Sequence, residues 1–462
     1  MVAAHLKKSK ISIFTLCFVI FSYTATASYG IEDIVGWGGP ALAFLILILV
    51  PIIWSMPMAL VSAELTSMYP QDGGLYVWIN KGMGEVAGFL AGWWYFLCSV
   101  VSCAVFLVIA ISYIESMAGG FTPVVRILVS SAIVLAIAYI NVKGIGAVGV
   151  STIIFLVIAL VPFFVMAVMG LGQLQFNPFE NFSLRGENAI TLSEFTSYGL
   201  ILGMWMYCGY EAIGSLAEEI DGSYHLIPKG LFIVLPITAV IYLVPTLIAA
   251  SAVGEWGSWG AEAGEGVITY VEMGYRIGGP ILMGAFLVSA LFSNLTCYNA
   301  YIASTSRFPF VMARDNLFFK SFANVSRKYG TPVWAIMVTS IINIFLSTHS
   351  FAGLLVMAMT LYFIPVVMFL ISAYILRKKQ PEAVRPYKVP GGDTFLLFLI
   401  CFPIAMICVA FWNMTNYELI SGVIGLATGP VAYICFKWKY GGQTSVVGDE
   451  PALEAGGGTE EM

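Results

Sequence analysis

One carboxylate lies deep within an apolar segment of this chain. Glu211 follows Glu194 by 17 residues and precedes Glu218 by 7, with mostly apolar and aromatic residues between them. At such a depth in a membrane helix a carboxylate is costly, so it usually faces a cavity or binds something. It could take up and release a proton, act as counter-charge to a bound ammonium group, or be a hydrogen-bonded structural residue. Glu64 and Glu115 lie nearer the ends of apolar segments, where we expect solvated or capping roles.

The segment that holds Glu211 is interrupted, and so is the apolar segment near the N-terminus. Residues 205–211 read WMYCGYE, and residues 23–30 read YTATASYG. Small and polar residues at mid-membrane depth weaken a helix and leave backbone groups that need partners. Breaks five segments apart indicate an inverted-repeat transporter with its substrate between the broken helices. Close helix packing on Gly and Ser is the alternative explanation.

Aromatic side chains gather near both interruptions, and their faces suit ammonium and guanidinium groups. However, 14% of the chain is aromatic, and most Trp and Tyr in membrane helices pack or form interface belts. Only aromatic residues that share a helix turn with an interruption are therefore favoured as ligands. The aromatic residues near the interruptions are Tyr23, Tyr29, Trp93, Trp94, Tyr95, Trp205, Tyr207, Tyr210, Tyr298 and Tyr362.

The composition requires lipid as the solvent. The chain is 59% hydrophobic and only 10% charged, with a mean hydropathy of +0.89, whereas a soluble domain carries roughly a quarter charged residues. The sequence contains no run of basic residues of the kind that binds nucleic acid, so we expect no nucleic-acid partner. The eight cysteines lie in apolar segments and the three histidines are far apart. We therefore infer no metal site, no cofactor and no enzymatic centre.

Twelve apolar stretches are long enough to be read as membrane helices, which need about 20 residues each. Residues 1–10 precede them as a cytoplasmic N-terminus, and residues 437–462 follow as a cytoplasmic tail that we expect to be disordered. The twelve stretches are 11–35, 40–66, 85–117, 123–140, 146–170, 194–217, 229–252, 280–303, 333–348, 351–376, 395–413 and 417–436.

The distribution of Lys and Arg predicts the orientation. With the N-terminus inside, eighteen of these residues lie on the inner side, and only Arg126, Arg185 and Arg276 lie outside. This bias predicts a multi-pass protein of a plasma or inner membrane with both termini in the cytoplasm. Residues 7–27 also imitate a cleavable signal peptide. We keep them as a helix, because their removal would reverse the charge pattern.

Five runs of sequence resemble the amino acid–polyamine–organocation superfamily. Residues 63–76 are similar to its AEL…P…GG.Y signature, and residues 141–144 to its short N..G turn. Residues 209–220 resemble the sixth-helix pattern G[FY][DE]…A.E[VI]. Residues 306–332 resemble SR..F.MARDG..P…TP, and residues 385–392 resemble RP[FY].[VI]P. Each run alone would be a weak signal, but their combination in this order is specific.

Within the superfamily, the plant and protozoan polyamine-uptake branch is the most similar. The similarity rests on GIED at 30–33, Gly-Pro at 39–40 and PIIWS at 51–55. Residues 25–27 are Ala-Thr-Ala where relatives are Gly-rich, which puts close approach of this backbone to a substrate in doubt. Ala159 replaces a lysine of some proton-coupled relatives, so we do not expect coupling through that lysine.

The resemblance implies an all-α LeuT-like fold of about 12 transmembrane helices. Its single transporter domain, 11–436, would hold two inverted five-helix repeats, 11–170 and 194–376, and two extra helices within 395–436. It further implies a secondary active carrier of amino acids or polyamines, by proton symport or exchange. A carrier specific for polyamines or other organic cations is the alternative. A solute channel, from a different functional class, would need a charge ring or filter motif that is missing here.

The resemblance also assigns roles to residues. The backbone from Ala25 to Gly30 would receive a substrate carboxylate at a half-helix start. Trp205 matches a gating aromatic, Tyr298 a further site-facing aromatic, and Glu211 the sixth-helix acid, which is also our proton-coupling candidate. A small-molecule substrate, protons and the lipid bilayer are the expected partners, and the oligomeric state stays open. The expected substrate-binding residues are Ala25, Thr26, Ala27, Ser28, Gly30, Trp205, Gly209, Glu211 and Tyr298.

Overall fold

The computed structural model describes residues 6–24, 28–180, 191–260, 266–349, 351–412 and 416–442. In these ranges the chain is helical, with isolated bridges that include Ser9 with Ile220 and Trp259 with Ile268. Eight helices in the described ranges are long and apolar enough to cross a membrane. The predicted all-α membrane protein is therefore confirmed, whereas the twelve-span layout stays a prediction.

Most helices overlap the predicted apolar stretches, but several bounds differ. The first predicted stretch, 11–35, is divided between two helices, and the eighth, 280–303, lies within a longer helix, Tyr270–Arg314. The twelfth continues to Tyr440, past the predicted boundary, and the ninth is a short helix of 14 residues. The predicted tail lies mostly outside the described residues, which end at Gly442. The α-helices are α1 (Ile13–Thr24), α2 (Ile31–Val50), α3 (Met56–Met68), α4 (Leu75–Met83), α5 (Glu85–Ala118), α6 (Pro123–Val142), α7 (Ile145–Gly170), α8 (Leu192–Met206), α9 (Ser223–Val253), α10 (Tyr270–Arg314), α11 (Val333–Leu346), α12 (Phe351–Lys379), α13 (Gly392–Phe411) and α14 (Asn416–Tyr440).

Both predicted interruptions are present. Helix α1 ends at Thr24 and the next helix begins at Ile31. Helix α8 ends at Met206, and after a non-helical stretch the chain resumes as a tighter 3₁₀ helix, Ala212–Glu219. Broken helices at membrane depth expose backbone groups that must find partners inside the protein or in a cavity. The two interruptions are therefore where a polar ligand would meet backbone.

Two short helices turn sharply into long ones in the same way. Helix α4 is followed by Gly84, with φ 94° and ψ 174°, where α5 begins. The first residues of α10 are followed by Gly279, with φ 70° and ψ −164°, immediately before Pro280. Only glycine adopts this backbone region readily, and proline also excludes helical geometry from the residue before it. Both corners precede the third long helix of a predicted repeat.

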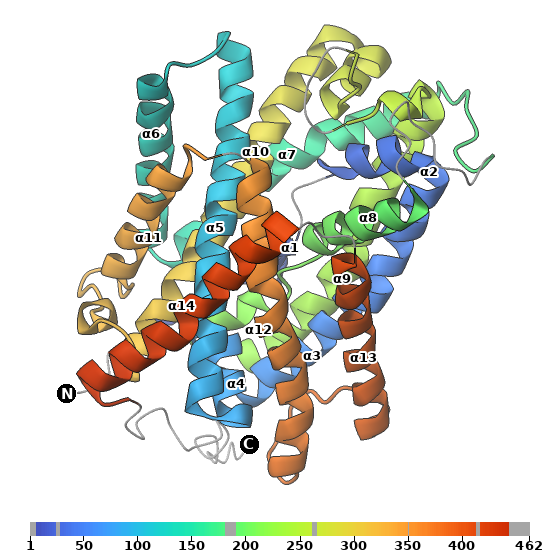
Figure 1. Cartoon of the computed structure of the whole chain (residues 1–462). Coiled ribbons are helices and arrows are strands. Elements are labelled where there is room, and N and C mark those ends of the chain that lie inside the picture. Colours follow the sequence, from blue (N-terminus) through green and yellow to red (C-terminus); the bar gives the residue numbers. More distant parts are fainter. Residues whose placement is uncertain are drawn as a thin grey trace, which may run out of the picture.

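Helices α5 and α10 form the centre of the bundle (Figure 1). Helix α10 packs against α5 and α7, α5 also packs against α12, and α1 packs against α7 and α9. Helices α6 and α11 pack together at one side, and α13 lies alongside α8 at the other (Figure 1). This packing surrounds both interruptions with long helices.

The expectation that Glu64 is solvated is wrong. Its carboxylate is 1% exposed. It accepts hydrogen bonds from the Arg377 guanidinium (Nε–Oε1 2.8 Å) and from the Val389 backbone N–H at 2.7 Å, because the end of α12 and the loop after it cover α3. Glu115 does lie near a helix end, where it pairs with Arg126 at 2.9 Å and stays partly exposed.

The first and last described segments lie at one end of the bundle. The Ser9 backbone N–H donates to the Glu219 carbonyl at 2.8 Å, and Glu219 pairs with Arg307 towards the end of α10. Lys320, just past α10, lies over the ring of Tyr440 in α14 at 5.7 Å. Ser9 and Tyr440 therefore both lie near the end of α10.

Candidate functional site

The two interruptions touch each other at Gly209. Its φ is +98°, and a Cβ added there would lie 2.3 Å from the carbonyl oxygen of Tyr23, the penultimate residue of α1. No real Cβ approaches backbone that closely, so only glycine fits. The same carbonyl accepts a hydrogen bond from the Tyr301 hydroxyl of α10 at 3.4 Å. The backbone of both breaks therefore meets at one point beside α10.

Glu211 ends the second interruption and is held by two tyrosines. The hydroxyl of Tyr95 in α5 donates to its Oε1 at 2.8 Å, and that of Tyr362 in α12 donates to the same oxygen at 2.9 Å. The side chain is 1% exposed, and Oε2 has no hydrogen-bond partner among the described residues. The ion pairs of the described part do not include Glu211. A buried carboxylate with one unpartnered oxygen can accept a proton or a cationic donor.

A small aromatic cavity lies beside the same break. Trp205, near the end of α8, stacks on Phe106 of α5 with ring centroids 6.0 Å apart and planes at 22°. The Trp205 ring also lies 4.0 Å from where a Cβ of Gly30 would be, so it spans from one break to the other. The cavity measures about 10 Å³, room for about one water molecule. Its lining residues are Tyr23, Thr24, Phe106, Trp205, Met206, Cys208, Cys297 and Tyr301.

Charged residues close the site on one side. Arg307 and Glu219, each 1% exposed, pair at 2.7 Å. Asp72, in the loop before α4, accepts the Glu218 backbone N–H at 2.9 Å. These contacts join the end of the 3₁₀ helix Ala212–Glu219 to α10 and to the α3–α4 loop. A solute leaving on this side would have to separate them.

Aromatic residues close the opposite side. The Tyr29 hydroxyl donates to the Phe286 carbonyl at 2.9 Å, and both rings pack with Tyr270 and Phe163. The carboxylate of Glu32 lies within this closure and accepts the Tyr270 backbone N–H at 3.2 Å. The site is thus covered from both sides, and a substrate larger than water would require these side chains to move.

The structure brings together some of the predicted site residues. Trp205, Gly209 and Glu211 lie around the second break, and Gly30 lies under the Trp205 ring. The predicted residues Ala25, Thr26 and Ala27 lie outside the described residues.

Ser28 and Tyr298 do not line the cavity, and the backbone role predicted for Ser28 stays a prediction. The Ser28 hydroxyl donates to the Ile241 carbonyl of α9 at 3.0 Å. Tyr298 is fully buried on α10, but the residues of α10 that line the cavity are Cys297 and Tyr301. Its part in binding stays a prediction.

Sequence reasoning missed several residues that complete the site. Tyr95 and Tyr362 stood out only as two aromatics among many, and no spacing rule links either to Glu211. Phe106 follows Tyr95 by 11 residues, about three helical turns, which puts both on one face of α5. Cys297 and Tyr301 have the i, i+4 spacing of one helix face. The sequence therefore shows which residues share a face of α5 or of α10, but it does not show which other helix that face packs against.

The sequence of the chain is similar to those of known transport proteins. Residues 11–432 match the amino acid permease family. A probable polyamine transporter of Arabidopsis thaliana is 30% identical over 409 residues, which cover 87% of this chain and 79% of the relative. The polyamine transporter PUT1 of Oryza sativa subsp. japonica is 31% identical over 408 residues, covering 86% and 73%. The b(0,+)-type amino acid transporter 1 of Mus musculus is 22% identical over 400 residues, covering 83% and 78%.

Proposed function

Since the chain belongs to the amino acid permease family, we propose that it is a secondary active transporter whose cargo is a polyamine. Glu211 is the counter-charge for one ammonium group of that cargo. The observation that carries this is the buried Glu211 oxygen that has no partner among the described residues, while two neutral hydroxyls hold the other. A carboxylate with no cation of its own is suited to pair with a cationic ligand.

The surroundings of Glu211 favour a cation over a zwitterion. Glu211 itself does not line the small cavity beside the second break, but the described residues that do include Trp205, Phe106 and two tyrosines, and they include no Lys or Arg. Aromatic faces attract ammonium groups, and a polyamine has no carboxylate that would need a basic partner. An α-amino acid would place its carboxylate at a half-helix start instead. Relatives named as polyamine transporters support the first cargo.

The layout that we propose has twelve spans, with two inverted repeats at 11–170 and 194–376. The two glycine corners, at Gly84 and Gly279, support it, because they occupy equivalent places in the two repeats. Alternating access would then come from rocking one repeat against the other around the fixed site. The termini at one end of the bundle, together with the Lys and Arg bias, support a cell-membrane protein with both termini inside.

Uptake into proteoliposomes tests the cargo. Labelled putrescine should enter the purified protein's vesicles saturably, and unlabelled spermidine should compete more strongly than any of the twenty amino acids. Glu211→Gln should weaken putrescine binding at least ~30-fold at every pH, because it removes the charge that pairs with a buried ammonium. Competition by a neutral amino acid that matches or exceeds spermidine would refute the polyamine cargo.

The same variant separates the two roles of Glu211. If binding survives in Glu211→Gln and only uptake driven by a pH gradient is lost, Glu211 is the proton carrier rather than the counter-charge. Glu194→Gln is the matched control, because Glu194 caps the start of the same segment and Gln preserves that cap. It should leave binding and pH dependence unchanged.

A further inference from the structure

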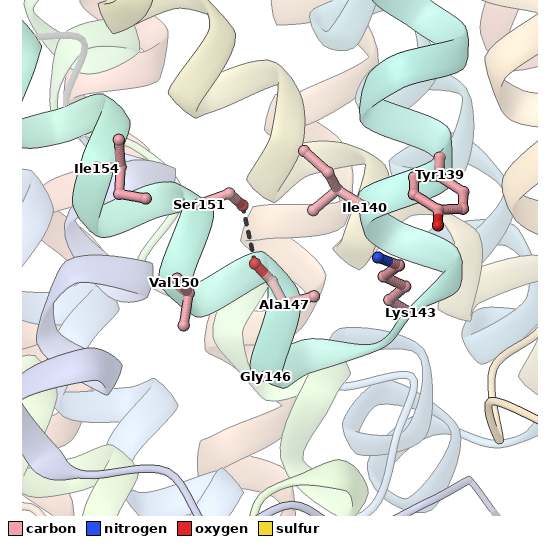
Figure 2. A pocket seen from close by; sticks show the side chains of 8 residues that line it. All are labelled: Tyr139, Ile140, Lys143, Gly146, Ala147, Val150, Ser151 and Ile154. Carbon is pink, nitrogen blue, oxygen red and sulfur yellow. Dashed lines mark hydrogen bonds between the residues drawn. The ribbon is translucent and has the colours of Figure 1, made fainter.

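A shallow groove of about 510 Å³ opens between α6 and α7, on the outside of the bundle (Figure 2). Tyr139 and Ile140 of α6 form one wall, and Ala147, Val150 and Ile154 of α7 form the other. The side chains of Tyr139, Val150 and Ile154 are each more than half exposed. In a chain that spans a membrane, such a wall faces lipid. From Ala147 to Ile154 the wall extends ~10 Å along the helix, enough for part of an acyl chain.

One cation stands at the mouth of this groove. Lys143 follows α6 directly and lines the groove, and its Nζ lies 4.5 Å from the centroid of the Tyr139 ring (Figure 2). Helix α7 begins after Gly144 without a side-chain cap, so its first backbone N–H groups add positive potential at the same mouth. The groove therefore has one charged end and one apolar end, which is the polarity of a phospholipid.

Three further cations lie in segments that hydrogen bonds join to this turn. The Thr331 hydroxyl donates to the Val142 carbonyl at 2.8 Å and so fixes the preceding loop, with its exposed Arg327 and Lys328, against this turn. The Lys7 backbone N–H donates to the carbonyl of Gly330 in the same loop, at 3.2 Å. The ion pairs among described residues do not include Lys7, Lys143, Arg327 or Lys328. Lys143 at the groove, with exposed cations on these neighbouring segments, complements an anionic headgroup.

We propose that this groove binds an anionic phospholipid, with the headgroup phosphate at Lys143 and one acyl chain along Val150 and Ile154. The opposite face of α7 packs on α1, where a Cβ at Gly149 would lie 2.6 Å from the Thr15 side chain. Ser151, which lines the groove, accepts a hydrogen bond from Asn299 of α10 at 2.9 Å. The bound lipid is thus one helix away from the interrupted α1, and it is distinct from the substrate site.

Native mass spectrometry of the purified full chain, titrated with dioleoyl phosphatidylglycerol or dioleoyl phosphatidylcholine, tests this site. Phosphatidylglycerol should bind at least about fivefold more tightly, and Lys143→Gln should remove most of that preference, since each Lys near a lipid surface contributes about that factor. Lys439→Gln is the matched control, because Lys439 also lies over a tyrosine ring, that of Tyr440 at 5.4 Å, but no residue of α14 lines the groove. It should bind both lipids as the unmodified chain does.

A second variant tests the apolar wall without changing charge. Ala147→Phe should fill the groove and weaken binding of both lipids while the putrescine uptake described above persists. Glycerol 3-phosphate, which has the headgroup charge but no acyl chain, should not displace phosphatidylglycerol. Equal affinity for the two lipids in the unmodified chain would overturn the proposal, and so would equal effects of Lys143→Gln and Lys439→Gln or displacement by glycerol 3-phosphate.

Discussion

The 3₁₀ helix Ala212–Glu219 separates two buried carboxylates that are held in opposite ways. Glu211, just before it, and Glu219, its last residue, are each 1% exposed. Glu219 pairs with Arg307 at 2.7 Å, whereas one oxygen of Glu211 accepts hydrogen bonds from two neutral tyrosine hydroxyls. A carboxylate whose cation belongs to the protein holds two helices together. One held by hydroxyls is available to a cation from outside.

Asp315, directly after α10 and outside the membrane-spanning segments, is a further buried carboxylate that is held by a tyrosine hydroxyl, as Glu211 is. The Tyr76 hydroxyl donates to its Oδ2 at 2.5 Å, and Oδ1 has no hydrogen-bond partner among the described residues. Burial raises the pKa of Asp315 to about 6, although the Tyr76 hydrogen bond opposes the shift. Asp315 is therefore poised to exchange a proton near pH 6, and substitutions can test the contrast between carboxylates held by arginine and by tyrosine.

The largest expected effect is on stability, at Arg307. Arg307→Met leaves Glu219 buried without its cation, which should lower the free energy of unfolding by about 3–5 kcal/mol. Thermal unfolding in detergent measures it. The double variant Arg307→Met with Glu219→Leu should recover most of the loss, because no uncompensated charge is left.

Arg314→Met provides the matched control for that measurement. Arg314 pairs with Glu218 at 3.3 Å, and both side chains are partly exposed, so the loss should be within about 1 kcal/mol. Equal destabilisation by the two arginine variants would remove the contrast between a buried and an exposed pair.

A smaller effect is expected at Asp315, and it depends on pH. The folded state holds the Asp315 proton up to a pKa of about 6, whereas an unfolded aspartate releases it near 4. Between these values the folded state binds more protons, so its stability falls as the pH rises from about 4 to about 6 and is level above. Asp315→Asn should remove this component, on the order of 2–3 kcal/mol, from the difference between thermal unfolding at pH 4.5 and at pH 7.5. Parallel curves for the two proteins would contradict the raised pKa.

Removing one of the two tyrosine hydroxyls that donate to Glu211 should have a still smaller effect, on the KM for the substrate. Tyr95→Phe takes one donor from the ionised carboxylate, which should raise the KM for putrescine about tenfold, since hydrogen bonds to charged groups contribute about 1.5 kcal/mol or more. Tyr362→Phe should act similarly, because its hydroxyl bonds the same oxygen. Uptake kinetics of the two single variants and the double variant measure this. An unchanged KM in the double variant would mean that Glu211 does not meet the cargo.

The sequence predicted the elements of this site better than their partners. Small and polar residues located both helix breaks, and the position of Glu211 within an apolar segment made it a candidate site residue. Its partners Tyr95 and Tyr362 lie more than a hundred residues away on α5 and α12, and apolar periodicity does not specify which helices face each other. Glu64 was misjudged for the same reason, since its partner Arg377 lies on a helix that only the fold brings near.

The smallest expected effect distinguishes two neighbouring tyrosines of α10. The resemblance to known transporters favours Tyr298 as a site residue, whereas the cavity is lined by Tyr301, whose hydroxyl reaches the Tyr23 carbonyl at the first break. At 3.4 Å that hydrogen bond is long, so Tyr301→Phe should raise the KM for putrescine only a few-fold, as the loss of ~0.5–1 kcal/mol implies. Tyr298→Phe should leave the KM unchanged, because a residue three positions away is rotated by about 60° around the helix. If Tyr298→Phe has the larger effect, α10 turns a different face to the substrate during transport. The comparison between Glu211 and Glu219 would then describe only the closed form of the site.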